Sequence, residues 1–300
     1  MSILVNWLES LHEEMKVSSR CVRERNRKAT CGFCVQTCKQ NAFEIKDHLL
    51  ILDTNKCTMC GECMLACPLS AIEGVLSNRV FDGGSLVFNY NYVPSIKELL
   101  IYKKRGMTSI QVSQQPLSKE WKTVVSQSND YLQMLDEDSI EVVQKVKEEV
   151  LSRRAFFGSF QKEGKQLAKS MAPAAWKMKQ DDWKITRYYP DYQFFTVQLN
   201  KEKCTLCQAC FALCPENVFQ IKNNKLVIQN EKCVNCTSCT DVCPENTIEI
   251  ILDVKSIKDS QENVHLKACI VCEHPFYTFN VENEKCPVCA NRDSDWLSPY

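Results

Sequence analysis

Hydrophobic positions along the chain recur in short runs that are separated by polar turns. The apolar run Ala42–Ile45 is followed by the polar turn Lys46–His48 and by a second apolar run, Leu49–Leu52. The same order recurs much later, with Val218–Ile221, a polar turn and Leu226–Ile228. Two short apolar runs joined by a short polar turn are typical of a β-hairpin. The sequence therefore predicts two hairpins that lie far apart in the chain.

The stretch between the two hairpins alternates strand-like and helix-like patterns. Ser85–Tyr90 and Thr108–Val112 are strand-like, Ser95–Lys104 and Lys119–Leu135 are helical, and Ile140–Val150 is ambiguous between the two. Strands that alternate with helices predict a small α/β domain with parallel pairing. Because no glycine-rich phosphate loop follows a strand here, we expect a packing or docking role for this domain.

Cysteine content changes the picture more than any other feature of the composition. The 300 residues include 20 cysteines, in blocks at 21–67, 204–243 and 269–289. The first residues contain several glutamates and no unbroken apolar core, so we expect no signal peptide, and no apolar run is long enough to span a membrane. We therefore expect a cytoplasmic protein, in which disulfides do not persist and clustered thiols bind metal.

Charge and histidine content argue against other functions. Lysine and arginine balance aspartate and glutamate at 37 each, and a net charge of zero gives no reason to expect a nucleic-acid partner. The four histidines, His12, His48, His265 and His274, lie in no motif with an acid or a nucleophile. The sequence therefore indicates no catalytic site of its own.

The second cysteine block contains the spacing C-x2-C-x2-C-x3-C-P twice, beginning at Cys204 and at Cys233. This spacing resembles that of the bacterial two-cluster ferredoxins, over roughly residues 194–254. The resemblance implies two [4Fe–4S] clusters, each held by three cysteines of one loop and by the fourth cysteine of the other motif. The implied ligand sets are Cys204, Cys207, Cys210 and Cys243 for one cluster, and Cys233, Cys236, Cys239 and Cys214 for the other.

The first cysteine block follows the same pattern with one departure. A complete motif begins at Cys57, but in the motif before it Lys28 stands where the first cysteine belongs. Cys21 is the one unassigned thiol that could replace it, so the site holds a [4Fe–4S] cluster completed by Cys21, holds three irons, or is empty. The resemblance implies the ligand sets Cys21, Cys31, Cys34 and Cys67, and Cys57, Cys60, Cys63 and Cys38.

The residues around the departure are strongly basic: Arg20, Arg23, Arg25, Arg27 and Lys28. One hypothesis is a solvated basic loop. The other is a docking patch for an acidic partner, or a local field that raises the reduction potential of the adjacent cluster.

The third cysteine block has the spacing of a tetrahedral four-sulfur site. Its two halves are Cys269-x2-Cys272 and Cys286-Pro-Val-Cys289, which is similar to rubredoxins and to zinc ribbons. Either zinc or a single rubredoxin-type iron suits it, and Glu273, where a rubredoxin has glycine, favours zinc. We expect His274 to be a surface residue, and a small core to form from Phe276, Tyr277, Phe279 and Val281.

These patterns predict an α+β chain with two ferredoxin-like modules of pseudo-twofold βαβ hairpin units. The predicted parts are a first module at 1–80, an α/β domain at 81–150, a linker helix at 151–193, a second module at 194–255 and a zinc-ribbon-like site at 262–293. The resemblance implies electron transfer through four [4Fe–4S] clusters, with a molybdenum- or flavin-dependent oxidoreductase as partner. The alternative is an accessory protein for maturation of a molybdoenzyme, with a role for the SRRAFF segment Ser152–Phe157.

Overall fold

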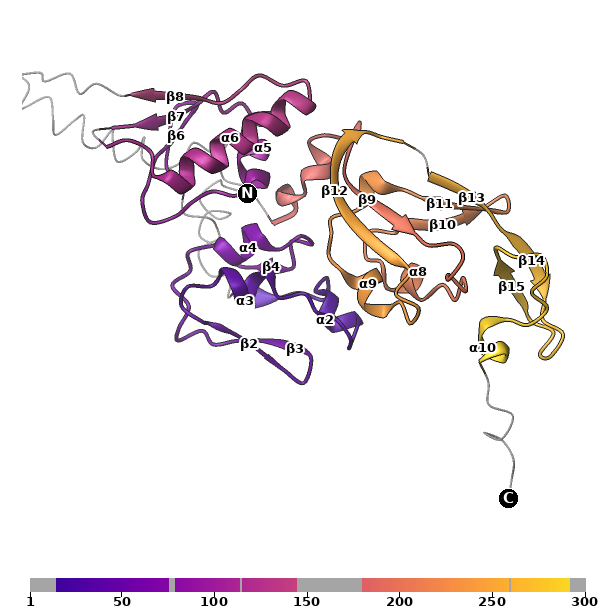
Figure 1. Ribbon diagram of the computed structural model, residues 1–300. Coiled ribbons are helices and arrows are strands. Elements are labelled where there is room, and N and C mark those ends of the chain that lie inside the picture. Colours follow the sequence, from indigo (N-terminus) through magenta and orange to yellow (C-terminus); the bar gives the residue numbers. More distant parts are fainter. Residues whose placement is uncertain (1–14, 76–78, 114, 145–179, 259, 292–300) are drawn as a thin grey trace, which may run out of the picture. The chain divides into compact units, whose positions relative to one another are not determined.

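The computed structural model describes residues 15–75, 79–113, 115–144, 180–258 and 260–291 (Figure 1). The chain divides into two compact units. Unit 1 comprises residues 1–18, 32–46 and 50–189, and unit 2 comprises residues 19–31, 47–49 and 190–300. Among the described residues, no helix is long and apolar enough to cross a membrane.

The first module is built from very short strands. β1 (Lys16–Val17) pairs antiparallel with β4 (Ile72–Glu73). The predicted first hairpin is present, with β2 (Phe43–Lys46) beside β3 (Leu49–Leu52). Each cysteine loop leads into a five-residue helix. The irregular loop is followed by α3 (Phe33–Thr37), and the regular loop that begins at Cys57 is followed by α4 (Glu62–Ala66). A further helix in this part of the sequence, α2 (Val22–Arg25), belongs to unit 2.

The rest of unit 1 is the predicted α/β domain, and its parallel pairing is confirmed. Its sheet has the strand order β5-β6-β7-β8, in which β6, β7 and β8 are parallel and β5 is antiparallel to β6. The strands are β5 (Phe81–Asp82), β6 (Ser85–Val87), β7 (Ser109–Val112) and β8 (Glu141–Gln144).

Two helices connect the parallel strands, α5 (Ile96–Lys104) between β6 and β7 and α6 (Lys119–Met134) between β7 and β8 (Figure 1). Ser95 and Ser118 cap them, because each hydroxyl accepts a hydrogen bond from a free amide of the first helical turn. Trp121 is fully buried and donates its indole N–H to the carbonyl of Tyr92 at 2.7 Å.

The end of the predicted linker packs on the α/β domain. Residues 180–187 form two 3₁₀ turns, η2 (Gln180–Trp183) and η3 (Ile185–Arg187). Trp183 is buried with its ring edge-on to Tyr102, and the hydroxyl of Tyr189 donates to the carbonyl of Leu100 at 2.9 Å. The segment Ser152–Phe157 and the rest of the linker lie outside the described residues.

The second module has longer strands. β9 (Tyr192–Leu199) pairs antiparallel with β12 (Ile248–Ser256). The predicted second hairpin, β10 (Phe219–Lys222) and β11 (Lys225–Ile228), gains a third strand, β13 (Ser260–Asn263). Asn223 and Asn224 both have positive φ, 50° and 56°, as a two-residue hairpin turn requires.

The core of the second module lies between these strands and two short helices, α8 (Ala209–Leu213) and α9 (Ser238–Val242), with the turn η4 (Asn230–Lys232). Its buried apolar residues include Val197, Leu206, Val218, Phe219, Leu226, Ile228 and Ile248. After it come β14 (His265–Ala268), β15 (Pro275–Thr278) and α10 (Pro287–Ala290), which carry the third cysteine block.

Candidate metal centres

The cysteine loops have a repeated backbone geometry. In three of them the second and fourth residues after the first cysteine have positive φ, which turns successive amides toward one side and makes an anion-binding concavity. These residues are Met59 and Gly61, Leu206 and Gln208, and Asn235 and Thr237. The irregular loop lacks this conformation, because Gly32, at the fourth position, has a φ of −143°. The departure seen at Lys28 in the sequence therefore extends to the backbone.

A second feature occurs in all four repeats. The amide four residues after the last cysteine of each motif donates a hydrogen bond to that cysteine's sulfur. The pairs are Ala42 to Cys38 at 3.3 Å, Ala71 to Cys67 at 3.2 Å, Val218 to Cys214 at 3.4 Å and Thr247 to Cys243 at 3.4 Å. Amide donors stabilise a thiolate and are one of the features that set a cluster's reduction potential. The sequence repeat therefore places the same amide-to-sulfur hydrogen bond at the last cysteine of every motif.

In the second module, cysteines of both motifs line two common pockets. One pocket is lined by Cys204, Cys207, Cys210 and Cys243. A second pocket is lined by Cys214, Cys233, Cys236 and Cys239. Three thiols of each set come from one loop and the fourth comes from the other motif, so both halves of the module contribute to each pocket.

The electrostatics of these thiols suit a multivalent positive group. Burial, together with the nearby thiols of Cys204, Cys207 and Cys243, raises the pKa of Cys210 to about 12. Burial also raises the pKa of Cys239, with further increases from neighbouring thiols of its own set and from Cys210. Buried thiols that repel each other's negative charge ionise readily only when a metal centre compensates them. The residues present therefore fit a [4Fe–4S] cluster in each pocket.

Unit 1 contains one set of the same kind. Cys38, Cys57, Cys60 and Cys63 line a cavity of about 480 Å³. Burial, together with the thiols of Cys60, Cys34 and Cys57, raises the pKa of Cys63 to about 12.

The fourth predicted set is divided between the two units. Cys34 and Cys67 lie in unit 1, and Cys21 and Cys31 lie in unit 2. The completion of this site by Cys21 therefore stays a prediction.

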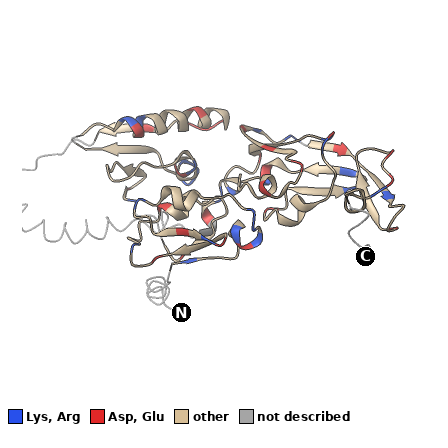
Figure 2. Cartoon of the chain, turned by 60° about the horizontal axis from the view of Figure 1, so that its bottom comes forward, with Lys and Arg blue, Asp and Glu red and all other residues tan. Residues whose placement is uncertain are grey.

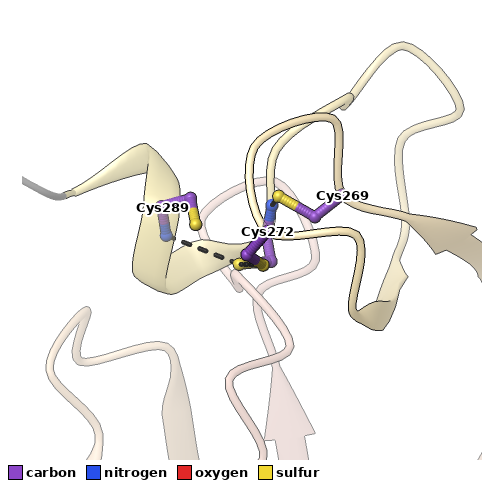
Figure 3. Close-up of side chains that lie close together, drawn as sticks. Cys269, Cys272 and Cys289 are labelled. Atoms are coloured by element: carbon purple, nitrogen blue, oxygen red, sulfur yellow. Dashed lines mark hydrogen bonds between the residues drawn. The ribbon is translucent and has the colours of Figure 1, made fainter.

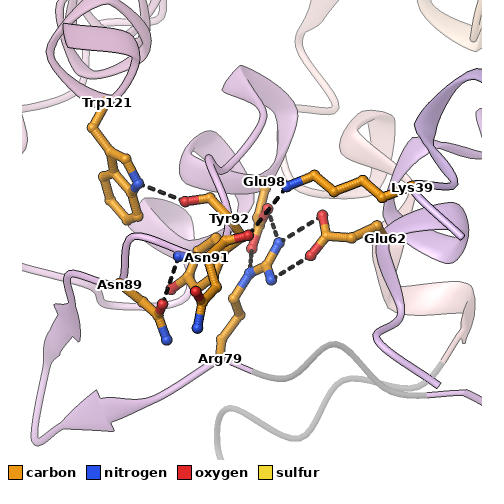
Figure 4. Close-up of polar contacts among 8 residues, drawn as sticks. All are labelled: Lys39, Glu62, Arg79, Asn89, Asn91, Tyr92, Glu98 and Trp121. Carbon is orange, nitrogen blue, oxygen red and sulfur yellow. Dashed lines mark hydrogen bonds and ion pairs between the residues drawn. The ribbon is translucent and has the colours of Figure 1, made fainter. Parts of the chain in front are cut away.

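An ion-pair network beside the cysteines of unit 1 was not expected from the sequence (Figure 4). Arg79, which is 7 % exposed, donates from Nε to Glu98 at 2.6 Å and from Nη1 to Glu62 at 2.7 Å. Its guanidinium also lies 3.7 Å from the centre of the Tyr92 ring. Glu62 lies between Cys60 and Cys63, so the network joins a cluster loop to helix α5 of the α/β domain.

A second contact from α5 reaches the other end of α4. The ammonium of Lys97 donates to the carbonyls of Leu65 and Cys67, at 3.2 and 3.3 Å. Burial lowers the pKa of Lys97 to about 8, while the Cys67 thiol and Glu98 oppose that change. The sequence signal for both contacts was the pair of charged residues Lys97 and Glu98 within the apolar helix pattern.

The basic segment is not simply a solvated loop. Arg23 is buried, and its guanidinium donates to the carbonyl of Cys31 at 2.7 Å and to that of His48 at 3.3 Å. Arg25, Arg27 and Lys28 are exposed. Figure 2 shows basic and acidic segments interspersed along the described parts of both units, in keeping with the balanced charge.

The C-terminal cysteines converge as predicted (Figure 3). The sulfur atoms of Cys269, Cys272, Cys286 and Cys289 all lie within 4.8 Å of one another. Those of Cys272 and Cys286 are 3.8 Å apart, close to the roughly 3.8 Å that a tetrahedral site with zinc–sulfur bonds of about 2.3 Å requires. The amide of Cys286 donates to the Cys269 sulfur at 3.3 Å and lowers the pKa of that thiol to about 6.

The surroundings of this group differ in part from expectation. His274 is exposed, as predicted, with Nδ1 at 2.8 Å from the Cys272 carbonyl oxygen. Of the four residues expected to form the small core, only Phe276 packs with these cysteines. Tyr277 and Phe279 pack against the core of the second module, and Val281 is 60 % exposed, so the prediction for these three residues was wrong. The C-terminal four-cysteine group has little core of its own, because Tyr277 and Phe279 pack on the apolar core of the second module instead.

Comparison with known proteins agrees with this geometry. The 4Fe-4S dicluster domain family matches residues 29–71 and residues 196–244. An uncharacterized ferredoxin of Methanocaldococcus jannaschii is 40 % identical over 47 residues, which are 16 % of this chain and 30 % of that protein. A second uncharacterized ferredoxin of the same organism is 37 % identical over 46 residues, 15 % of this chain and 74 % of that protein.

The chain therefore belongs to the ferredoxin family and carries two 4Fe-4S dicluster domains. Such domains transfer electrons through iron–sulfur clusters. The match spans only 30 % of the length of the first of these relatives, so the two share a domain and not a whole architecture.

Proposed function

We propose that this chain relays single electrons through four [4Fe–4S] clusters, as a ferredoxin-type subunit or dedicated partner of a larger oxidoreductase. The observation that carries the proposal is the convergence of cysteines from both halves of a module on common pockets. We assign all sixteen cysteines of the first two blocks as cluster ligands, with Cys21 in the place of the missing cysteine.

Ligation of each cluster by four cysteines favours an electron carrier over a catalyst. A cubane with a thiolate on every iron has no open coordination position, so it accepts and releases electrons without binding a substrate. The chain's residues hold the clusters, exclude water from the buried sulfurs and donate amide hydrogen bonds to them. The substrate chemistry then belongs to a partner enzyme with a molybdenum or flavin centre, in the reducing cytoplasm.

The C-terminal group is assigned to one structural zinc, with a rubredoxin-type iron as the alternative. The short separation of its sulfur atoms suits a single tetrahedral metal. A bound metal would fix the two knuckles and hold β14 and β15 against the second module.

The function is tested by capturing the partner enzyme with the anaerobically purified chain and measuring electron transfer between them. The proposal predicts that the mature partner rapidly reduces or oxidises the clusters. A chain that binds only the immature partner and exchanges no electrons with the mature one would contradict it, and would indicate the maturation role instead.

A further inference from the structure

The basic segment, residues 19–31, belongs to unit 2 and presents three cations to solvent. Arg25, Arg27 and Lys28 are exposed, and Glu24 is the one acidic residue of the segment. Figure 2 shows this stretch around α2 as mostly basic. Within the described part of the chain, none of the three cations forms an ion pair, and Arg25 alone donates a side-chain hydrogen bond, to a backbone carbonyl. The segment therefore keeps a net positive charge at the surface.

Hydrogen bonds fix the backbone that carries these cations. Arg23, which is buried, donates to the carbonyls of Cys31 and His48 at 2.7 and 3.3 Å. The amide and the hydroxyl of Thr30 both donate to the carboxylate of Asp241, each at 2.8 Å. Ordering a backbone costs conformational entropy, so a segment that only solvates a surface has no need of such anchors. The cations are thus held in place before any partner binds.

The middle of the segment contacts a cluster loop of the same unit. Asn26, which is 4 % exposed, donates from Nδ2 to the carbonyl of Ser238 at 3.3 Å. Ser238 and Cys239 both line the pocket that we assign to the cluster of this loop. Arg25 and Arg27 are the immediate neighbours of Asn26 in the chain. Two exposed guanidinium groups therefore flank the residue that contacts the cluster loop.

We propose that Arg25, Arg27 and Lys28 form the docking surface for an acidic face of the redox partner, which exchanges electrons with the cluster beside them. This docking role rests on the proposed function and adds which surface the partner binds. Guanidinium groups bind carboxylates in a bidentate geometry. A surface whose position is already fixed loses little entropy on binding. Opposite charges on two electron carriers also steer and orient their encounter.

An acidic protein fits this surface better than a nucleic acid does. Three exposed cations beside one acidic residue form a small patch, whereas nucleic-acid binding relies on a basic stripe or face of a domain. The chain as a whole carries no net charge. A cluster bound by four thiolates is itself negative, so fixed cations beside it offset its repulsion of an acidic partner.

The step at this surface moves one electron. The reduced cluster is oxidised as the partner's acceptor is reduced, or the reverse, and every iron–sulfur bond stays intact. The patch acts on the association of the two proteins, so removing its charges should weaken docking without changing the clusters.

The test uses the full chain with all clusters and the variant Arg25→Gln/Arg27→Gln. Arg25→Lys/Arg27→Lys keeps both charges. Lys222→Gln/Lys225→Gln is the matched control, because it removes two exposed cations of the hairpin β10–β11 in the same unit. A labelled oligoglutamate peptide is the acidic probe and a labelled DNA duplex is the second probe, with binding of each measured by fluorescence anisotropy.

A third probe locates the site. The anion tris(oxalato)chromate(III) is paramagnetic, so it shortens the spin relaxation of a reduced cluster near which it binds. Microwave power saturation then compares the EPR signal that Cys236→Ala removes with the signal that Cys207→Ala removes, because these cysteines line different pockets.

At low salt, Arg25→Gln/Arg27→Gln should weaken peptide binding by roughly tenfold, about the effect of losing two exposed ion pairs. Arg25→Lys/Arg27→Lys and the hairpin control should bind the peptide as the wild type does. The difference should vanish at high salt, because the Debye length falls from about 30 Å at roughly 0.01 M to about 3 Å at roughly 1 M.

In the wild type, tris(oxalato)chromate(III) should relax the Cys236-dependent signal at a lower concentration than the Cys207-dependent signal. That preference should be lost in Arg25→Gln/Arg27→Gln. Equal peptide binding by the wild type and this variant, or equal relaxation of both signals in the wild type, would overturn the proposal.

The other outcomes separate the alternatives. Binding of the DNA duplex more tightly than the peptide, with loss in Arg25→Gln/Arg27→Gln, would contradict an acidic protein partner and indicate a nucleic acid. A wild-type chain without reducible clusters would contradict the proposed function instead, whatever the peptide does.

Discussion

The two modules bind their cysteines with the same spacing but stabilise the cysteine loops in different ways. In the second module, β9 and β12 pair over most of their length, and β13 extends the hairpin to three strands. In the described part of the first module, β1 and β4 pair at two positions. There, α5 of the α/β domain reaches the loops through Arg79–Glu98 and Lys97. A cluster loop therefore requires a rigid support, and either a longer sheet or a neighbouring domain can supply it.

The difference also indicates what the cysteine-free domain does. Its helix α5 is joined to both ends of α4. Arg79 bridges Glu98 of α5 to Glu62 at the start of α4, and Lys97 of α5 donates to the carbonyls of Leu65 and Cys67 at the end. These contacts fix the loop that carries Cys60 and Cys63. The α/β domain is thus part of the support of a metal centre although none of its residues is a ligand.

The largest effect is expected from Arg79→Met in unit 1. The substitution leaves Glu98, which is 1 % exposed, buried without its counter-charge, and breaking a buried ion pair in this way costs about 3–5 kcal/mol. We expect a lower melting temperature and loss of iron from the first module, with the second module unaffected. Thermal unfolding and iron analysis of the anaerobic protein measure both.

Lys16→Met is the control for that change, because the exposed Lys16 forms an ion pair at 3.4 Å with the half-buried Glu73 in the same module. Exposed pairs of this kind contribute about 0–1 kcal/mol. Equal losses in Arg79→Met and Lys16→Met would show that the first module does not depend on the α/β domain.

The next largest effect tests crosswise ligation in the second module. Cys243→Ala should perturb the same EPR signal as Cys207→Ala, because both thiols line one pocket. The signal that responds to Cys236→Ala should change less, since Cys236 lines the other pocket. If Cys243→Ala instead groups with Cys236→Ala, ligation is local and the module consists of two independent loops.

A smaller effect is expected from Cys21→Ser in the irregular motif. It should remove one cluster or convert it to a three-iron form, visible in the oxidised EPR spectrum, because serine does not replace a thiolate ligand. Lys28→Ala is the control, since Lys28 is exposed and cannot ligate iron.

The double variant Cys21→Ser/Lys28→Cys sharpens the comparison between the modules, because it restores the regular spacing. Recovery of the cluster would indicate that Cys21 substitutes for the missing cysteine. Unchanged iron and spectra in Cys21→Ser alone would leave Cys21 without a role in ligation.

The smallest effect on the clusters is expected from Cys272→Ser in the C-terminal group. One metal per chain should be lost, while the cluster EPR signals and iron–sulfur content stay as in the wild type. His274→Ala should change neither, because the imidazole is exposed and contacts only a carbonyl of this group. Loss of cluster signals in Cys272→Ser would show that the knuckle also supports the second module.

The sequence predicted the parts that depend on local pattern. Both hairpins, helices α5 and α6 and strands β6 and β7 follow from apolar periodicity. The convergence of the C-terminal cysteines follows from their spacing in the same way.

Contacts between distant segments could not be predicted. Arg79 forms ion pairs with Glu62 and Glu98 because the fold brings α4 and α5 together. The pattern of apolar and polar residues along the sequence does not indicate such a contact. From the sequence, Tyr277 and Phe279 were expected to form a core for the C-terminal cysteine group. In the structure they pack against the larger core of the second module. The anchoring of Thr30 on Asp241 joins residues separated by more than two hundred positions.

Metal and sulfide analysis of the anaerobically purified full chain, with EPR of the reduced protein, tests the central claim most directly. The account predicts about sixteen cluster irons with matching acid-labile sulfide per chain, together with about one further metal in the C-terminal group. Reduction should produce [4Fe–4S] signals. Zinc in proportion to every four cysteines, without acid-labile sulfide, would contradict the claim that this chain carries electrons.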